Sequence, residues 1–308
     1  MNTQNDNAIS VTDVNDAQAI ISLVLDGLSS VNSKRAYQKA LIDFMAWYTE
    51  QGKPGLSKAI VQRYKNVLQT LGLSSSTINQ RMSAIRKLAQ EAADNGLVDQ
   101  TIANGVARVG GVKSLGVRAG NWLTKGQAQA LINTPDITTL KGLKDRAILA
   151  VMLGAGLRRS EVAELTFDHI QQRDGRWVIV DIVGKGNRVR TVPIPSWTKA
   201  AIDEWAQAAG IRQGNIFLPV HKGGWINGNS MTPQAIRNTV SQYAQMLGFD
   251  TAAHDLRRTY AKLAHRGGSP LEQIQLSLGH ASIKTTEKYL GVQQNLADAP
   301  CDKLGLVL

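Results

Sequence analysis

One glycine-rich stretch divides this chain of 308 residues and limits what it can fold into. Residues 103–121 (ANGVARVGGVKSLGVRAGN) contain five glycines, three basic residues and no acidic residue. That composition suits a flexible linker lying along a polyanion better than a packed element. Because a chain of this length has room for about two domains, we predict an N-terminal domain at 1–110, a linker at 111–122 and a second domain at 123–308.

Hydrophobic periodicity predicts an all-helical N-terminal domain that follows a disordered segment at 1–15. Apolar residues recur every three or four positions, as on one face of a helix. Ser57 and the run of serines that begins at Ser74 are typical helix N-caps, and the glycines at 52 and 96 are typical of helix ends. The helices are expected at about 17–28, 33–50, 58–71 and 75–94.

The second domain is predicted to be mostly helical with a small antiparallel β-sheet, so the fold class is mainly α. Residues 176–195 (RWVIVDIVGKGNRVRTVPIP) alternate and are rich in β-branched residues around a Gly-Lys-Gly-Asn turn, which indicates a β-hairpin. Thr124 is a typical N-cap for the first helix of this domain. The helices are expected at about 125–132, 140–154, 197–208, 233–247, 255–266, 270–278 and 283–289.

The charge of the chain points to a polyanionic partner. The net charge is +11, and residues 33–90 alone hold ten basic residues against two acidic ones, a net +8. Nucleic acid and an anionic membrane could both attract such a segment. We favour nucleic acid, because the segment lacks the large apolar face with Trp or Phe anchors that is typical of an interfacial helix.

Cysteine usage and hydropathy indicate a soluble, cytoplasmic protein. Cys301 is the single cysteine, so it forms no internal disulfide, and no Cys or His cluster surrounds it to make a zinc site. The N-terminus lacks a basic-then-apolar signal pattern, and the longest apolar run, 147–157, is too short to cross a bilayer. We expect no membrane partner and a place on the nucleoid.

Four short motifs of the second domain are each weak when taken alone. Arg158 in GLRRSE could be an ordinary surface arginine, and Lys185 at a hairpin tip could be a solubilising lysine. His254 and Arg257 could lie at the exposed start of a helix. The stretch SLGHASIKTTEKYL adds a histidine, His280, and nine residues later a tyrosine, Tyr289. A phenol ionises near pH 10, so a nucleophilic tyrosine would need activation.

Together these residues provide the chemical groups that phosphoryl transfer without a metal requires. A phosphodiester attacked by a phenol gains negative charge on its non-bridging oxygens, which two forked guanidiniums can hold. A lysine or histidine can protonate the leaving 5′-oxygen, while another histidine accepts the phenol proton. The chemistry requires neither a metal nor a nucleotide cofactor.

In these motifs the chain resembles the tyrosine recombinase (phage integrase) family, as a site-specific recombinase with two domains. The resemblance covers essentially the whole chain, because SKRAYQKALIDFMAWY and SSSTINQRMSAIRKLAQEA are similar to DNA-facing segments of the family's core-binding domain. It implies cleavage and rejoining of duplex DNA through a covalent 3′-phosphotyrosine. The six catalytic residues that it implies occur in the family's order: Arg158, Lys185, His254, Arg257, His280 and Tyr289.

The resemblance also implies a role for each catalytic residue. Tyr289 would attack the scissile phosphate, Arg158 and Arg257 would hold its non-bridging oxygens, and Lys185 would be the general acid for the 5′-oxygen. His254 would act as acid or base near the nucleophile.

Further roles follow from the same resemblance. His280 would hydrogen-bond the phosphate and Glu161 would orient the segment of Arg158. Arg159 and Arg258 are expected only to stabilise the surface or touch the DNA backbone. For the basic N-terminal segment we predict contact with DNA as part of a C-shaped clamp, against the alternative of a merely solvated face, by Lys34, Arg35, Arg81, Arg86 and Lys87.

The apolar C-terminus predicts assembly. Leu304, Leu306, Val307 and Leu308 need a hydrophobic groove on the same subunit or on a neighbour. Since a C-terminal helix of the family docks on the adjacent protomer, we expect a tetramer on a short core recombination site of double-stranded DNA. The four subunits could be identical or include a related partner recombinase.

Two other functions compete with this interpretation. A type IB topoisomerase-like enzyme shares the chemistry but acts as a monomer without sequence specificity; the core-binding helices and the apolar tail argue against it. A DNA-binding regulator that has lost cleavage should lack a catalytic side chain, and none is missing here. Dimer resolution, transposition and integration all remain compatible with the sequence.

Overall fold

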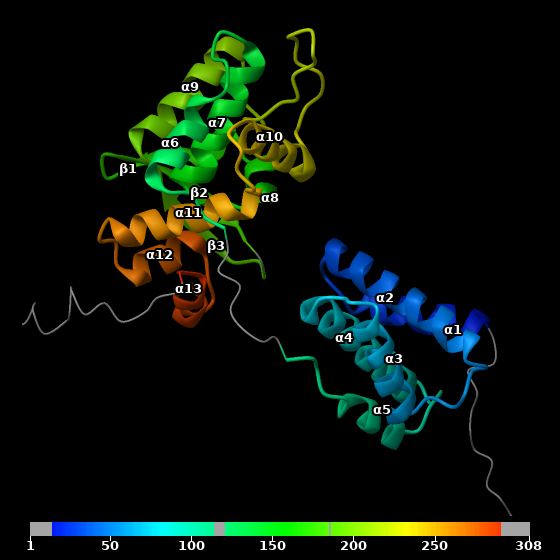
Figure 1. Ribbon diagram of the computed structural model, residues 1–308. Helices are drawn as coiled ribbons and strands as arrows, with labels where there is room; N and C mark the ends of the chain where they lie inside the picture. The colour runs from blue at the N-terminus through cyan, green and yellow to red at the C-terminus, as the bar shows by residue number, and fades with distance from the viewer. Residues whose placement is uncertain (1–13, 114–120, 185, 291–308) are drawn as a thin grey trace, which may run out of the picture. The chain divides into compact units, whose positions relative to one another are not determined.

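The computed structural model describes residues 14–113, 121–184 and 186–290, with only the backbone for 14–17, 288 and 289. The chain divides into two compact units, Met1–Val117 and Arg118–Leu308, each with a hydrophobic core of its own (Figure 1). The predicted domain boundaries at 110 and 122 lie on either side of this division. Most of the segment predicted to be disordered, the centre of the predicted linker and the C-terminal tail lie outside the described residues.

The described part of the first unit is entirely helical, as predicted. Its first helix begins at Val14, two residues inside the segment expected to be disordered. Ser57 and Ser74 accept hydrogen bonds from the backbone N–H groups of the helices that follow them, which confirms both caps. The helices are α1 (Val14–Asp26), α2 (Val31–Glu50), α3 (Lys58–Thr70), α4 (Ser75–Asp94) and α5 (Gln100–Ala107).

Helix α5 corrects the sequence analysis, which assigned residues from 103 onward to a flexible stretch. Asp99 caps α5 by accepting a hydrogen bond from the backbone N–H of Thr101, and Ala103 and Val106 are buried. The helix packs against α3 and α4. Tertiary burial therefore overrides the low helix propensity of Gly105.

Aromatic side chains fill the centre of the first unit. Phe44 and Tyr48 of α2 are buried and stack, and Phe44 meets Tyr64 of α3 edge-on with ring centroids 5.1 Å apart. Leu41, one turn before Phe44, and Met82 of α4 are also buried. The 3- to 4-residue spacing of the apolar positions in α2 thus forms one buried face.

The second unit is mostly helical with one three-stranded antiparallel sheet. Its helices are α6 (Lys125–Asn133), α7 (Leu140–Gly154), α8 (Arg159–Ala163), α9 (Ser196–Ala209), α10 (Pro233–Met246), α11 (Ala253–Arg266), α12 (Leu271–Leu278) and α13 (Ile283–Leu290), with a 3-10 turn at Phe167–His169; its strands are β1 (Ile170–Arg173), β2 (Arg176–Val183) and β3 (Val189–Pro193), in the sheet order β1-β2-β3. The sequence analysis found the β2–β3 hairpin and seven of these helices, but it missed β1 and the short α8.

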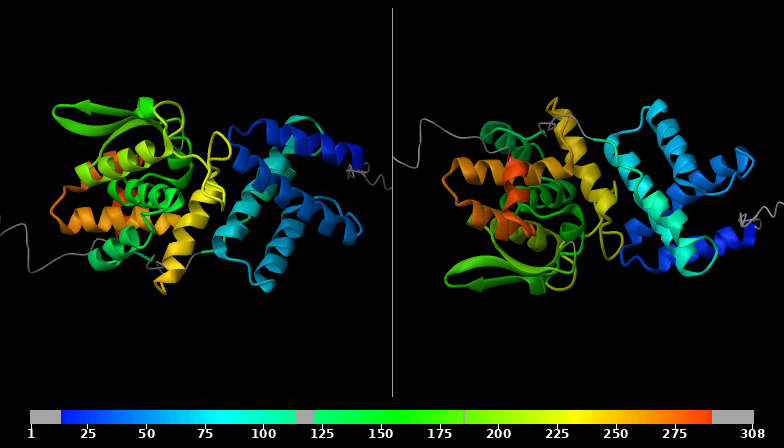
Figure 2. Two further views of the ribbon diagram at one scale, coloured as in Figure 1. Left: turned by 90° about the horizontal axis from the view of Figure 1, so that it is seen from above. Right: turned by 90° about the horizontal axis from the view of Figure 1, so that it is seen from below.

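Helix α7 forms the centre of this unit. Its residues from Ala147 to Leu153 are all buried, because α7 packs against α6, α8, α9, α10 and α11. The sheet lies at one side of the helices of this unit in both views of Figure 2. The segment from Ala147 to Leu153 is apolar on every side and needs such complete cover. Helix α7 is therefore the buried centre around which these five neighbouring helices pack.

Candidate active site

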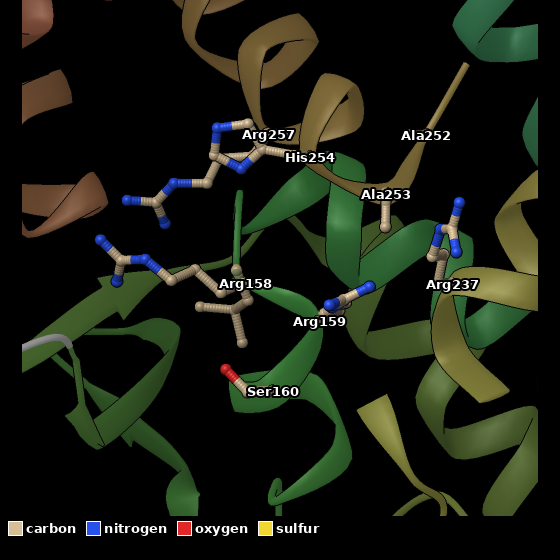
Figure 3. Close-up of a pocket in the computed structure, with 9 residues that line it drawn as sticks. Arg158, Arg159, Ser160, Arg237, Ala252, Ala253, His254 and Arg257 are labelled. Carbon is tan, nitrogen blue, oxygen red and sulfur yellow. The ribbon is translucent and has the colours of Figure 1, made fainter. Parts of the chain in front are cut away.

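A cavity of about 390 Å³ in the second unit brings together three of the predicted catalytic residues. Arg158 precedes α8, and His254 and Arg257 lie in the first two turns of α11. Figure 3 shows the side chains of these three residues gathered at one side of the cavity. Residues about 100 positions apart in the sequence therefore share one site.

Glu161 fixes the position of Arg158. The carboxylate of Glu161 accepts a hydrogen bond from the backbone N–H of Arg158 at 2.8 Å and another from its Nη1 at 2.6 Å. The first bond ties the carboxylate to the residue at the N-cap position of α8, and the second directs the guanidinium. This geometry agrees with the orienting role expected for Glu161.

Arg190 of β3 is a residue that the sequence analysis missed. Its Nη1 and Nη2 donate to the two carboxylate oxygens of Glu161 at 3.0 and 2.8 Å, and its Nε donates to the carbonyl of Ser277 at 2.8 Å. The Arg190 side chain is 7% exposed. It thus links β3 to α8 through a forked ion pair and to the end of α12 through a hydrogen bond. The available signal was its place two residues before the buried Val192, on the same face of the strand, but no local pattern identifies its partner.

Electrostatics hold the Glu161 carboxylate in its charged form. Burial acts to raise its pKa, but the hydrogen bonds and charges of Arg190 and Arg158 outweigh burial and lower it. The negative charge therefore stays between the two guanidiniums, which offsets part of their mutual repulsion.

Arg257 is almost completely buried, at 1% exposure. Its Nη1 donates to the carbonyl of Gly156 at 2.7 Å, and its Nη2 donates to the carbonyl of Leu278. Gly156 has φ of +61°, and a Cβ at this position would lie 2.6 Å from the ring of Tyr260. A buried arginine is stable only with such partners, and these carbonyls orient its guanidinium.

The two predicted histidines are held in the neutral form. Burial, followed by the charges of Arg257 and Arg158, lowers the pKa of His280 to about 4. Partial burial and the charges of Arg258 and Arg257 lower the pKa of His254. Both rings are therefore mainly neutral at pH 7, in the absence of a bound anion.

His280 connects this network to α13, the helix that contains Tyr289. Its Nδ1 lies 2.9 Å from the hydroxyl of Thr286, which is buried in α13. Tyr289 lies one turn later in the same helix, and its side chain is outside the described residues. The structure thus places the backbone segment of the predicted nucleophile on a helix that contacts the site.

Lys185 lies outside the described residues, but its neighbour Gly184 shows where the hairpin turn begins. A Cβ on Gly184 would lie 3.1 Å from Nη1 of Arg190 and 3.3 Å from Nη1 of Arg158. The backbone N–H of Gly184 donates to the carbonyl of Arg188 at 2.8 Å and closes the turn. Gly184, which directly precedes Lys185 in the sequence, therefore lies beside the two arginines.

The predicted DNA-contact residues of the first unit differ in their surroundings. Arg35 is exposed, and Lys34 and Lys87 form partly exposed pairs with acidic residues. Arg81 pairs with Asp43 at 2.8 Å with its side chain 15% exposed. Arg86 donates to the backbone carbonyl of Val109. Contact with DNA by these five residues stays a prediction. To contact DNA, Arg81 would have to share or exchange Asp43, and Arg86 would have to share or exchange the carbonyl of Val109.

Neither a metal cluster nor a membrane-spanning helix occurs among the described residues. Among the residues that the structure describes, no cluster of three or more His, Cys, Asp and Glu side chains is arranged to hold a metal ion. In the same part of the chain, no helix has the length and apolar character needed to cross a membrane.

Comparisons with known proteins identify similar sequences and folds. Residues 121–295 match the model of the Phage integrase family, and residues 21–96 match that of the phage integrase N-terminal SAM-like domain. The tyrosine recombinase XerC of Xylella fastidiosa is 29% identical over 268 residues, which cover 85% of this chain and 86% of that protein. The tyrosine recombinase XerD of Pseudomonas aeruginosa is 25% identical over 269 residues, or 84% and 86% of the two chains.

Solved structures share the fold. The XerH site-specific recombinase in a post-cleavage complex with palindromic difH substrate matches with a TM-score of 0.69 at 17% identity, over 91% of this chain and 81% of that one. A lambda integrase dimer bound to a COC′ core site matches with a TM-score of 0.66 at 15% identity, over 91% and 78%. At such identities the likeness establishes the architecture alone.

Proposed function

Because this chain belongs to the phage integrase family, we propose that it is a site-specific DNA recombinase that cleaves and rejoins duplex DNA through a covalent 3′-phosphotyrosine. The observation that carries the proposal is the shared cavity of Arg158, His254 and Arg257, supported by the buried Glu161–Arg190 pair. The solved complexes of XerH and lambda integrase contain DNA, which supports double-stranded DNA as the partner.

The proposed reaction is a transesterification. The phenol oxygen of Tyr289 attacks the scissile phosphorus, and the bond from phosphorus to the 5′-oxygen breaks. The phenol proton passes to His254, whose lowered pKa keeps the ring neutral and able to accept it. Lys185 protonates the departing 5′-oxygen. Attack by a 5′-hydroxyl of another duplex reverses these steps and releases the tyrosine, so no metal or ATP is needed.

The arginines stabilise the transition state in this scheme. Arg158 and Arg257 hold the non-bridging oxygens, and their bonds to Glu161, Gly156 and Leu278 fix the two guanidiniums before DNA binds. Such preorganised donors need little reorganisation during reaction, which is the main origin of electrostatic catalysis.

Neutral His280 suits the role of hydrogen-bond donor to the phosphate. When the Thr286 hydroxyl donates to Nδ1, the ring proton is on Nε2, which can then donate to a phosphate oxygen. With the Thr286 hydroxyl as donor, this contact is compatible with the tautomer that the proposed role requires.

Strand exchange is proposed to occur in a tetramer. A groove of about 740 Å³ in the second unit is lined by polar and apolar side chains; the apolar ones include Ile132, Leu153 and Leu263, and also Trp197, which is 45% exposed. This groove could receive the apolar C-terminal residues 304–308 of a neighbouring copy. A head-to-tail exchange of this kind closes into a ring.

Covalent trapping tests the chemistry. The protein is incubated with nicked duplexes that carry candidate core sites, and adducts that survive denaturant are separated by size. The wild-type protein should form an adduct, whereas Tyr289→Phe should bind the same duplexes and form none. Tyr243→Phe, which also loses a phenol hydroxyl in this unit, should still form the adduct. An adduct with Tyr289→Phe, or binding by the wild-type protein without any adduct, would refute the proposal.

A further inference from the structure

The cavity contains two more arginines that the proposed reaction does not use. Arg159 is the first residue of α8, and Arg237 lies in α10. In Figure 3 the side chains of these two residues lie at the side of the cavity away from the guanidiniums of Arg158 and Arg257. The cavity therefore has two separate arginine pairs.

Helix packing brings Arg159 and Arg237 to the same place. Helix α10 packs against α8 and buries Ile236 and Val240 on its inner face. Arg237 directly follows Ile236 and is exposed, as is Arg159. Both side chains are thus presented to solvent from rigid elements, although the two residues are far apart in the sequence.

The second arginine pair, Arg159 and Arg237, lacks acidic partners among the described residues. Among the described residues, no carboxylate lies within 4 Å of the guanidinium of Arg159 or Arg237, whereas Arg158 and Arg190 both pair with Glu161. Two arginines that share one cavity without a carboxylate form a site of positive potential. Such a site is typical of recognition of a phosphate or another oxyanion.

We propose that Arg159 and Arg237 bind the backbone phosphate next to the scissile phosphate on the same DNA strand. This inference rests on the proposed function, which assigns the scissile phosphate to Arg158 and Arg257. Successive phosphates of one strand are separated by only about 3.4 Å of helix rise, so a strand held by one pair presents its next phosphate nearby.

The second pair sets the register of the strand. Phosphate contacts position a protein on DNA without reading its sequence. Binding of the neighbouring phosphate would keep the scissile phosphorus centred between Arg158 and Arg257. A carboxylate of another protein copy is the competing ligand, and the shared cavity favours the phosphate because both pairs then contact one continuous strand.

Salt dependence of DNA binding tests this proposal. Binding is measured for the Tyr289→Phe protein on a synthetic duplex of fixed, arbitrary sequence at several salt concentrations. Adding Arg159→Gln and Arg237→Gln together should reduce the slope of log K against log salt by about 0.9, since the pair contacts one phosphate and each neutralised phosphate contributes about 0.9. Arg212→Gln, which removes an exposed arginine outside the cavity, should leave the slope unchanged.

Lysine variants separate charge from folding. Arg159→Lys with Arg237→Lys retains two positive charges, so it should restore most of the slope, and thermal unfolding should show that both double variants remain folded. An unchanged slope in the glutamine variant would overturn the inference, and so would a loss confined to assembly of several copies. The wild-type protein is assayed in parallel for the covalent adduct; a missing adduct with a reduced slope would refute the recombinase chemistry alone.

Discussion

At the scale of single residues, the Glu161 carboxylate determines how the site is built. It accepts hydrogen bonds from both Arg158 and Arg190, and its side chain is 4% exposed. A buried ion pair contributes little net stability relative to apolar residues, but removal of one partner leaves an uncompensated buried charge. Glu161 is therefore a residue whose loss should affect both folding and catalysis.

Replacement of the carboxylate tests this argument. Glu161→Gln should lower the free energy of unfolding of the second unit by about 3 kcal/mol, because two arginines lose their counter-charge. Glu164→Gln, which alters an exposed carboxylate at the end of the same helix, is the matched control and should change stability little. Chemical denaturation of the three proteins gives the comparison, and equal stability of the two variants would contradict it.

At the scale of elements, the end of α12 couples backbone geometry to the site. Gly279 adopts φ of +62° at the C-cap, which turns the chain toward His280. A Cβ at this position would lie 3.0 Å from Cδ of Arg190. The same glycine thus allows the left-handed turn and leaves room for the arginine that holds Glu161.

Two glycine substitutions separate these effects. Gly279→Ala and Gly210→Ala both place alanine in a left-handed C-cap, and each should cost about 1 kcal/mol of stability. No atom lies within 4 Å of a Cβ built at Gly210. Only Gly279→Ala should displace Arg190, so it alone should slow cleavage of a bound duplex in single-turnover assays. Equal cleavage rates for the two variants would show that the contact with Arg190 is irrelevant.

At the scale of the whole molecule, two cores that share no residue stabilise the two units. Phe44 and Met82 belong to the first core, and Leu149 and Trp205 belong to the second. Each core draws its side chains from several elements of its own unit. Because the contacts within a core make the unfolding of a domain cooperative, we expect each unit to unfold in a separate cooperative transition.

Calorimetry with one core substitution in each unit tests this expectation. Phe44→Ala removes a fully buried ring and should destabilise the first unit by about 3–5 kcal/mol, while Leu149→Ala should destabilise the second by about 2–5 kcal/mol. Each substitution should lower the midpoint of one transition and leave the other in place. A single transition that shifts in both variants would mean that the units unfold together.

The sequence by itself determined the elements whose cause is local. Periodic apolar residues, the caps at Ser57 and Ser74, and the alternation of residues 176–195 predicted helices and a hairpin that the structure confirms. The order of the motifs from Arg158 to Tyr289 also indicated the family that the comparisons establish. The periodicity, the caps and the alternation depend on residues within a few positions of one another, and the family signal depends on short motifs in a fixed order, so a single sequence reveals them all.

Only the tertiary structure decided which side chains meet. Helix α5 forms because burial against α3 and α4 outweighs its glycine, and the site depends on Arg190 meeting Glu161, 29 residues away, and Ser277, 87 residues away. Arg257 likewise reaches a carbonyl 101 residues away. Such contacts arise when packed elements bring distant backbone and side chains together, and no local pattern encodes the identity of the partner.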